Sequence, residues 1–147
     1  MQTAEPPRAE QPVPAPRPIL VINDAREFLE LLREFLAEEG YAVATHASGE
    51  GVLDLVHALD PALVILDLVL GEIDGWVVLT HLRADDRARE LPVIVCTAAS
   101  DRARTFGDEL AAAGVHVLEK PFDLEHLLAL IVDLAGAPGG AGWTEAV

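Results

Sequence analysis

The most constraining feature of the sequence is a run of four apolar residues, Leu63-Val64-Ile65-Leu66, that leads directly into the carboxylate of Asp67. An uninterrupted apolar run of this length is typical of a strand buried on both faces, as in a parallel sheet. Asp74-Gly75 follows as a turn signal, so Asp67 is expected where a central strand ends and a loop begins. Because ligands of open α/β sheets bind outside the carboxyl ends of the strands, Asp67 is the first candidate site residue.

Apolar runs and helical spacings divide the chain into alternating elements. Strands are expected at 19–22, 41–45, 63–66, 93–97 and 115–118, and helices at 25–39, 52–59, 76–84, 101–113 and from Asp123 to Leu134. This alternation predicts an α/β fold, a doubly wound five-stranded parallel sheet with right-handed crossovers. The flavodoxin-like strand order 2-1-3-4-5 fits this pattern.

Three helices carry specific expectations. The helix 25–39 should bury one face, because its apolar residues recur at helical spacing. Those residues are Phe28, Leu31, Leu32, Phe35 and Leu36. Ser48 is expected to cap the helix 52–59, and Asp123 to cap the last helix.

Composition indicates one domain at 18–135, between a proline-rich tail at 1–17 and a glycine-rich tail at 136–147 that contains a lone Trp143. No apolar run approaches the roughly 20 residues of a membrane span, and no signal peptide is expected. The single cysteine, Cys96, is expected to be a core residue in a reducing cytoplasm. The formal net charge of −15 argues against nucleic acid as a partner.

Several polar side chains are expected to meet at one edge of the predicted sheet. The strand order places Asn23 and Asp24 beside Asp67, while Thr97 ends the fourth strand and Lys120 follows the fifth. Two carboxylates and a carbonyl form a hard oxygen site for Mg²⁺. A carboxylate can also accept a phosphoryl group as an aspartyl phosphate, whose charge a lysine and a hydroxyl would stabilise.

These motifs resemble the receiver domain of two-component response regulators, over about residues 18 to 135. The resemblance is carried by Asn23-Asp24, Asp67, Asp74-Gly75, Thr97-Ala98 and Lys120-Pro121-Phe122, in this order along the alternating pattern.

The resemblance implies a role for each matching residue. Asp67 would accept a phosphoryl group from a histidine kinase or a histidine phosphotransfer protein. Asp24, Asp67 and the backbone carbonyl of Val69 would bind Mg²⁺, with Asn23 contributing indirectly or through water. Thr97 and Lys120 would bind the phosphoryl oxygens. The Lys120-Pro121 peptide bond is expected to be cis.

The sequence departs from the family pattern at three positions. Asn23 replaces an acid, so Mg²⁺ binding should weaken, and Gly71 replaces a proline. Val117 stands where the family often has a switch aromatic, and it is β-branched and small. We therefore expect phosphorylation to be read out through the loop 98–101 and the helix after it, which Gly107 weakens by up to about 1 kcal/mol relative to alanine.

The expected function is a cytoplasmic, stand-alone signalling protein that assists only its own phosphorylation and dephosphorylation and acts on an unknown downstream protein. A module of the same fold that binds partners without phosphorylation remains the alternative. An enzyme is disfavoured. Phosphatases with an aspartyl nucleophile need a second acid at the position of Val69. The segment 23–26 does not have the composition of a flavin phosphate-binding loop. The five histidines lack the spacing of metal ligands.

Overall fold

The computed structural model describes residues 17–70, 73–98, 107–112 and 114–138 of the chain. The expectations for most of the two tails, for Trp143, for Gly71 and for most of the segment 98–106 therefore lie outside the described residues.

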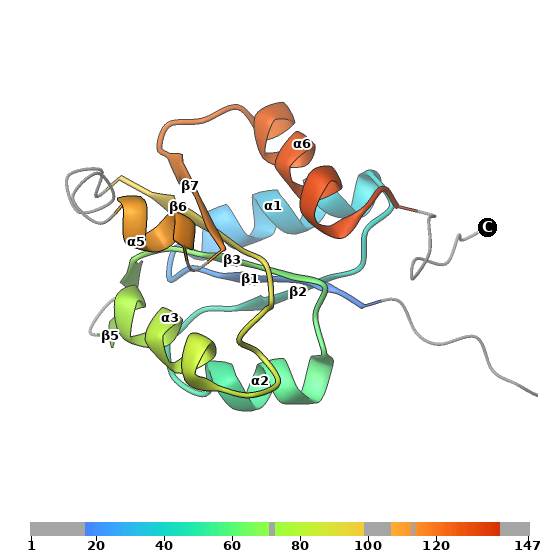
Figure 1. Ribbon diagram of the computed structural model, residues 1–147. Helices are drawn as coiled ribbons and strands as arrows, with labels where there is room; N and C mark the ends of the chain where they lie inside the picture. Colours follow the sequence, from blue (N-terminus) through green and yellow to red (C-terminus); the bar gives the residue numbers. More distant parts are fainter. Residues whose placement is uncertain (1–16, 71–72, 99–106, 113, 139–147) are drawn as a thin grey trace, which may run out of the picture.

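The centre of the fold is a five-stranded parallel sheet (Figure 1). Its strands are β1 (Ile19–Ile22), β2 (Val43–His46), β3 (Leu63–Leu66), β6 (Val93–Thr97) and β7 (Val115–Glu119). Their spatial order is β2-β1-β3-β6-β7, and every neighbouring pair is parallel. This is the predicted doubly wound order. From the edge strand β2 the chain crosses back past β1 and forms β3 on the other side of β1.

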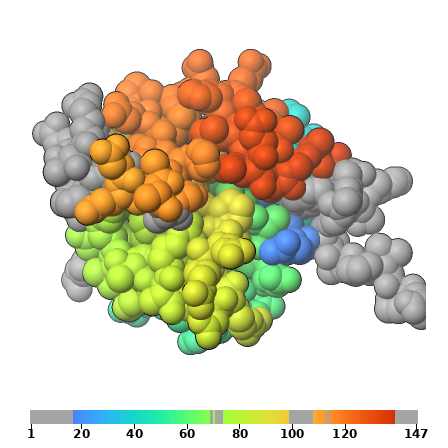
Figure 2. Space-filling view, in the orientation of Figure 1, coloured from blue at the N-terminus to red at the C-terminus, as the bar shows by residue number. Residues whose placement is uncertain are grey.

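Helices cover both faces of the sheet (Figure 1). They are α1 (Arg26–Glu38), α2 (Val52–Leu59), α3 (Gly75–Ala84), α5 (Gly107–Ala112) and α6 (Leu124–Ala135). Helices α1 and α6 pack on one face, whereas α2, α3 and α5 contribute to the core on the other face. In Figure 2 the orange and red C-terminal segments cover one half of the visible surface, and the green and yellow segments around α3 cover the other.

The continuous apolar runs are explained by burial on both faces. All residues of β1, β3 and β6 are buried. Alternate residues point to opposite sides, so Ile19 and Val21 join the core beneath α1 and α6, whereas Leu20 and Ile22 join the core beneath α2 and α3. Each fully buried aliphatic side chain contributes roughly 1.5–3 kcal/mol relative to an exposed one.

The buried face of α1 differs in phase from the prediction. Leu29, Leu32 and Leu36 are buried, whereas Leu31 is 49% exposed. Residues 29, 32 and 36 are spaced by three and four, which forms one stripe, and Leu31 is rotated by about 100° from Leu32. The prediction of Leu31 as a core residue was wrong because five apolar residues are compatible with more than one stripe.

Local caps also differ from the prediction. Gly51, with φ +73°, precedes α2, and the Ser48 hydroxyl accepts a hydrogen bond from the Glu50 backbone N–H instead of capping the helix. Asp123 occupies the position before α6, but its side chain makes no capping hydrogen bond. The Lys120-Pro121 bond is cis, as predicted.

The segment after β3 contains structure that the sequence did not indicate. Two short strands, β4 (Val69–Leu70) and β5 (Ile73–Asp74), pair in antiparallel fashion where only a loop was expected. Asp74 then caps α3, because its side chain accepts a hydrogen bond from the Trp76 backbone N–H over 2.9 Å.

Within the described part of the chain, none of the helices combines the length and the apolar character that a membrane crossing needs.

Candidate functional site

Parallel register brings the candidate residues to one edge of the sheet. Ile22 is the Cα partner of Leu66, so the next residues, Asn23 and Asp67, follow two neighbouring strands. The Asp67 backbone N–H donates to the Ile22 carbonyl over 3.2 Å, which fixes this alignment at the strand ends. The carboxyl ends of the strands thus form the site, as expected for an open α/β sheet.

Asp67 is the centre of this site. Its side chain is almost buried, and one of its oxygens, Oδ2, accepts two hydrogen bonds. The Lys120 ammonium donates over 2.8 Å and the Asn23 amide over 3.1 Å. A buried carboxylate needs such partners, and the hydrogen bond to the charged ammonium is the stronger kind.

The orientation of the Asn23 amide follows from its two partners. Its Oδ1 accepts a hydrogen bond from the Ala25 backbone N–H over 2.8 Å, so its Nδ2 faces Asp67. A backbone N–H can only donate and a carboxylate can only accept. If the amide were reversed, its NH₂ would face the Ala25 N–H and its oxygen would face the carboxylate, so neither hydrogen bond could form. Asn23 therefore links the start of α1 to the Asp67 carboxylate.

Gly75 allows the backbone to approach Asp67 closely. The Gly75 N–H donates to the Leu68 carbonyl over 2.8 Å at the start of α3. A Cβ at this position would overlap the Asp67 backbone oxygen and lie 2.6 Å from Leu68 Cα. Glycine is required here for space, because the opposing atoms are backbone and cannot rotate away.

Lys120 has a second contact that the sequence did not indicate. Its Nζ lies 4.8 Å from the ring centroid of Phe28, which belongs to the first turn of α1. The Phe28 and Phe122 rings meet edge to face, with centroids 6.3 Å apart at 88°. Helical spacing assigned Phe28 to the core. The observation that could have revealed this contact is position, because a helix that starts after β1 begins at the edge where the site lies.

Two buried residues end β6 next to this site. Thr97 is fully buried, and its backbone carbonyl accepts a hydrogen bond from the Lys120 N–H over 3.0 Å. Cys96 packs in the core as predicted, and burial raises the pKa of its thiol to about 12. Lys120 lowers that pKa and Asp67 raises it, both by smaller amounts.

The two remaining predicted site residues are Asp24 and Val69. Asp24 has an exposed side chain beside Asn23, and Val69 begins β4. Among the residues that the structure describes, no three histidine, cysteine, aspartate or glutamate side chains cluster closely enough to bind a metal. Of the described residues predicted to form the site, Asp24 and Asp67 supply two carboxylates at this edge.

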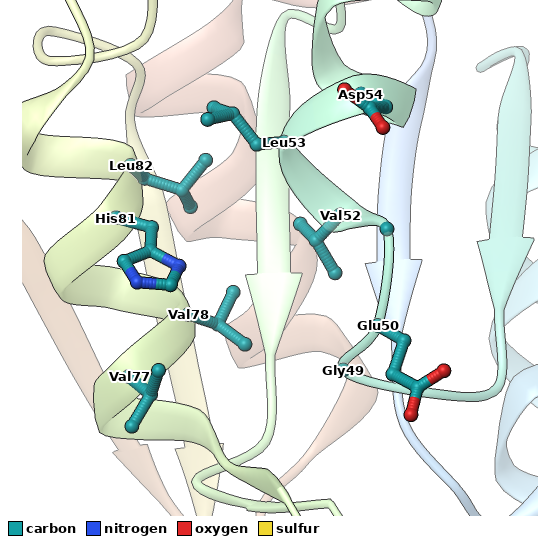
Figure 3. A pocket seen from close by; sticks show the side chains of 10 residues that line it. Gly49, Glu50, Val52, Leu53, Asp54, Val77, Val78, His81 and Leu82 are labelled. Carbon is teal, nitrogen blue, oxygen red and sulfur yellow. The ribbon is translucent and has the colours of Figure 1, made fainter.

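A separate cavity lies between α2 and α3 (Figure 3). It measures about 320 Å³, and Val52 and Leu53 line it from α2, opposite Val78 and His81 from α3. Its lining includes none of the predicted site residues. The cavity is therefore separate from the residues grouped around Asp67.

Comparison with known proteins identifies relatives of the chain. The family model for the response regulator receiver domain matches residues 19–132. The chain is 35% identical over 116 residues to the transcriptional regulatory protein GltR of Pseudomonas aeruginosa, covering 78% of this chain and 47% of GltR. It is 36% identical over 116 residues to the transcriptional regulatory protein HprR of Escherichia coli, covering 77% of this chain and 49% of HprR.

Solved structures give the same match. The response regulator TrrA of Thermotoga maritima, crystallised with Mg²⁺ and BeF, has a TM-score of 0.69 at 31% identity, covering 80% of this chain and 98% of TrrA. The N-terminal domain of a response regulator receiver protein from Methanoculleus marisnigri has a TM-score of 0.60 at 28% identity, covering 79% of this chain and 94% of that domain.

The share of the relatives' length that the chain covers bears on the expectation that nucleic acid is not a partner. The chain spans about half the length of the curated relatives it matches, and both relatives named above are transcriptional regulatory proteins. The exclusion of nucleic acid as a partner, drawn from the net charge, is therefore not supported.

Proposed function

The chain belongs to the response regulator receiver domain family, and on this premise we propose that Asp67 accepts a phosphoryl group from a histidine kinase or a histidine phosphotransfer protein. The observation that carries the proposal is the convergence of Lys120 and Asn23 on one oxygen of a nearly buried aspartate at the carboxyl edge of the sheet. An ammonium held at the reacting carboxylate is already placed to stabilise a transferred phosphoryl group.

The transfer step exchanges one bond to phosphorus for another. An Asp67 carboxylate oxygen forms the new P–O bond while the P–N bond to the partner's imidazole breaks. The imidazole leaves with the electron pair and takes up a proton from solvent. Lys120 stabilises the charge on the phosphoryl oxygens, and the hydroxyl of Thr97, at the end of β6, donates a hydrogen bond to one of them.

The donor set suits Mg²⁺. The carboxylates of Asp24 and Asp67 and the backbone carbonyl of Val69 are hard oxygen ligands, and Mg²⁺ commonly binds proteins through one or two carboxylates while keeping several waters. When bound, Mg²⁺ neutralises charge on the transferring phosphoryl group. Asn23 is neutral and directs its Nδ2 at Asp67, so it supplies no charge to the metal.

The phosphorylated protein acts as a cytoplasmic signalling component, through a downstream partner or as an intermediate in a phosphorelay. Its only chemistry on this proposal is its own phosphorylation and dephosphorylation. The downstream response of a longer chain could include nucleic-acid binding, since the relatives named above are transcriptional regulators.

Incubation with Mg²⁺ and a small-molecule phosphodonor, followed by intact mass measurement, tests the proposal. We expect a single phosphoryl adduct that disappears when the metal is chelated. Asp67→Asn should abolish it and leave the circular dichroism spectrum unchanged. Asp86→Asn is the matched control, because Asp86 is exposed and pairs only with Arg89 among the contacts of the described residues.

A second variant tests the metal part separately. Asn23→Asp adds a carboxylate at this edge and should lower the Mg²⁺ concentration needed for half-maximal phosphorylation. An unmodified mass at saturating donor, with the fold intact, would instead support a module of the same fold that binds partners without phosphorylation.

A further inference from the structure

We propose that Phe28 is a positioning residue for Lys120, whose ammonium the ring face holds beside the Asp67 carboxylate. The kinetic consequence of this contact rests on the proposed phosphorylation of Asp67. The contact itself does not, because it is present in the unphosphorylated protein.

The Lys120 ammonium is placed between two attractive surfaces. Its Nζ lies 2.8 Å from Asp67 Oδ2 and 4.8 Å from the Phe28 ring centroid. A cation within about 6 Å of an aromatic centroid is attracted by the negative face of the ring. Lysine has a flexible four-carbon stem, so a second contact removes freedom that the hydrogen bond alone would leave.

The Phe28 ring is itself held in place. Phe122, two residues after Lys120, meets it edge to face at 88°. Both rings are half-buried and pack against the core beneath α1 and α6. The edge-to-face arrangement is a preferred geometry for aromatic pairs, so Phe122 fixes the ring plane that Lys120 faces.

This arrangement suits a lysine whose partner moves. Phosphorylation of Asp67 transfers the acceptor from a carboxylate oxygen to phosphoryl oxygens that lie farther out. A hydrogen bond to a single atom would be lost in that change, whereas attraction to a ring face has no single acceptor atom and tolerates a shift of the ammonium across it. Phe28 therefore keeps Lys120 at the site before and after transfer.

The alternative is that Phe28 only fills the core. Phe35 provides a matched control, because it lies two turns further along α1, is half-buried and packs against the same core. Among the described residues, the ring that lies under a cation is that of Phe28, not that of Phe35. Phe28→Leu and Phe35→Leu remove similar apolar area, but only the first removes an aromatic face from Lys120.

The first measurement is nuclear magnetic resonance of the unphosphorylated protein without Mg²⁺. Lys120 is the only lysine in the sequence, so labelled lysine gives one set of side-chain signals. We expect the ε-methylene protons to be shifted upfield by the Phe28 ring current, in wild type and in Phe35→Leu. The shift should vanish in Phe28→Leu and persist in Phe28→Trp. An unchanged signal in Phe28→Leu would overturn the proposal.

The second measurement is the rate of adduct formation with a small-molecule phosphodonor at saturating Mg²⁺. We expect Phe28→Leu to slow it by about threefold to tenfold, Phe28→Trp to restore it and Phe35→Leu to leave it unchanged. Equal slowing in Phe28→Leu and Phe35→Leu would show that Phe28 acts only through core packing, and would overturn the positioning role. Absence of any adduct on wild type would overturn the proposed function instead, and the resonance measurement would still decide the contact.

Discussion

Cys96 shows how burial controls a reactive group one residue from the site. Its thiol is buried in the core, and burial raises its pKa to about 12. The thiolate is the reactive form of cysteine, and at about pH 8 it should be present at roughly one part in ten thousand. We predict that the native protein does not react with iodoacetamide at this pH, as followed by intact mass.

The same reagent in guanidinium chloride is the control. Unfolding returns the pKa of the Cys96 thiol to its ordinary value of about 8.5, so one carbamidomethyl group should be added rapidly. Rapid modification of the folded protein would show that β6 opens readily at its carboxyl end.

Single residues of the site were predictable to the extent that topology places them. Asn23, Asp67 and Lys120 each follow a strand, and parallel order brings strand ends together, so their convergence could be predicted. Phe28 could not be, because an aromatic residue at helical spacing is compatible with a core position and with the edge of the site. The donors to Asp67 Oδ2 also could not be assigned, because side-chain direction depends on packing.

At the scale of elements, the loop between β3 and α3 depends on one glycine. In Gly75→Ala the new Cβ would overlap the Asp67 backbone oxygen and lie 2.6 Å from Leu68 Cα. Overpacking against backbone typically costs about 1–3 kcal/mol. We predict that urea unfolding will show a loss of this size and that phosphorylation of Asp67 will slow, because its backbone must move.

Gly51→Ala separates crowding from backbone conformation. Unlike Gly75, Gly51 adopts a backbone conformation that favours glycine, with φ +73°, and a Cβ there has no neighbour within 4 Å. This variant should lose about 1–2 kcal/mol through the left-handed backbone alone and keep a normal phosphorylation rate. Equal rates in the two variants would contradict the role of Gly75 at the site.

A second prediction at this scale concerns the contact between α2 and the end of α3. Asp85 Oδ2 lies 2.9 Å from His57 Nε2 and accepts hydrogen bonds from the Arg87 and Ala88 backbone N–H groups. The hydrogen bond with His57 is the largest cause that lowers the Asp85 pKa, and the two backbone donors add to it.

The sign of the pH dependence follows from that direction. A carboxylate whose pKa is lower in the folded state contributes stability above its unfolded pKa of about 3.9 and loses it as pH falls through the folded value. We predict that Asp85→Asn will lower the urea midpoint at neutral pH and narrow its difference from wild type below about pH 3.9. Asp86 is next to Asp85 but exposed, so Asp86→Asn should change neither the urea midpoint at neutral pH nor its dependence on pH. A loss in the urea midpoint of Asp85→Asn that is the same at all pH values would contradict the prediction.

Element order could be predicted more reliably than element detail. The alternation of apolar runs and helical spacings predicted all five strands of the sheet, because continuous burial leaves a strong pattern. The pair β4 and β5 was missed, since two-residue strands leave no periodic pattern. The buried stripe of α1 was misassigned at Leu31, because its phase is fixed only when the helix packs on the sheet.

At the scale of the whole molecule, the site lies at the carboxyl ends of the strands that separate the two cores. Thr97 ends β6 and Lys120 directly follows β7, so a change at Asp67 can be transmitted along β6 or β7. Val117 stands on β7 in register with Val95 and packs against the core beneath α3. A β-branched side chain has one strongly restricted torsion and too few atoms to exchange between an exposed and a buried position.

We therefore predict that phosphorylation changes the segment 98–113, which includes α5, and leaves β7 largely unchanged. Gly107 at the start of α5 lowers helix stability, so rearrangement there costs little free energy. Hydrogen exchange with Mg²⁺ and beryllofluoride should show altered protection in this segment in wild type and none in Asp67→Asn. Val117→Tyr restores an aromatic side chain and should extend the change into β7. Changes confined to β7 in wild type would contradict this route, because Val117 would then carry the response without an aromatic ring.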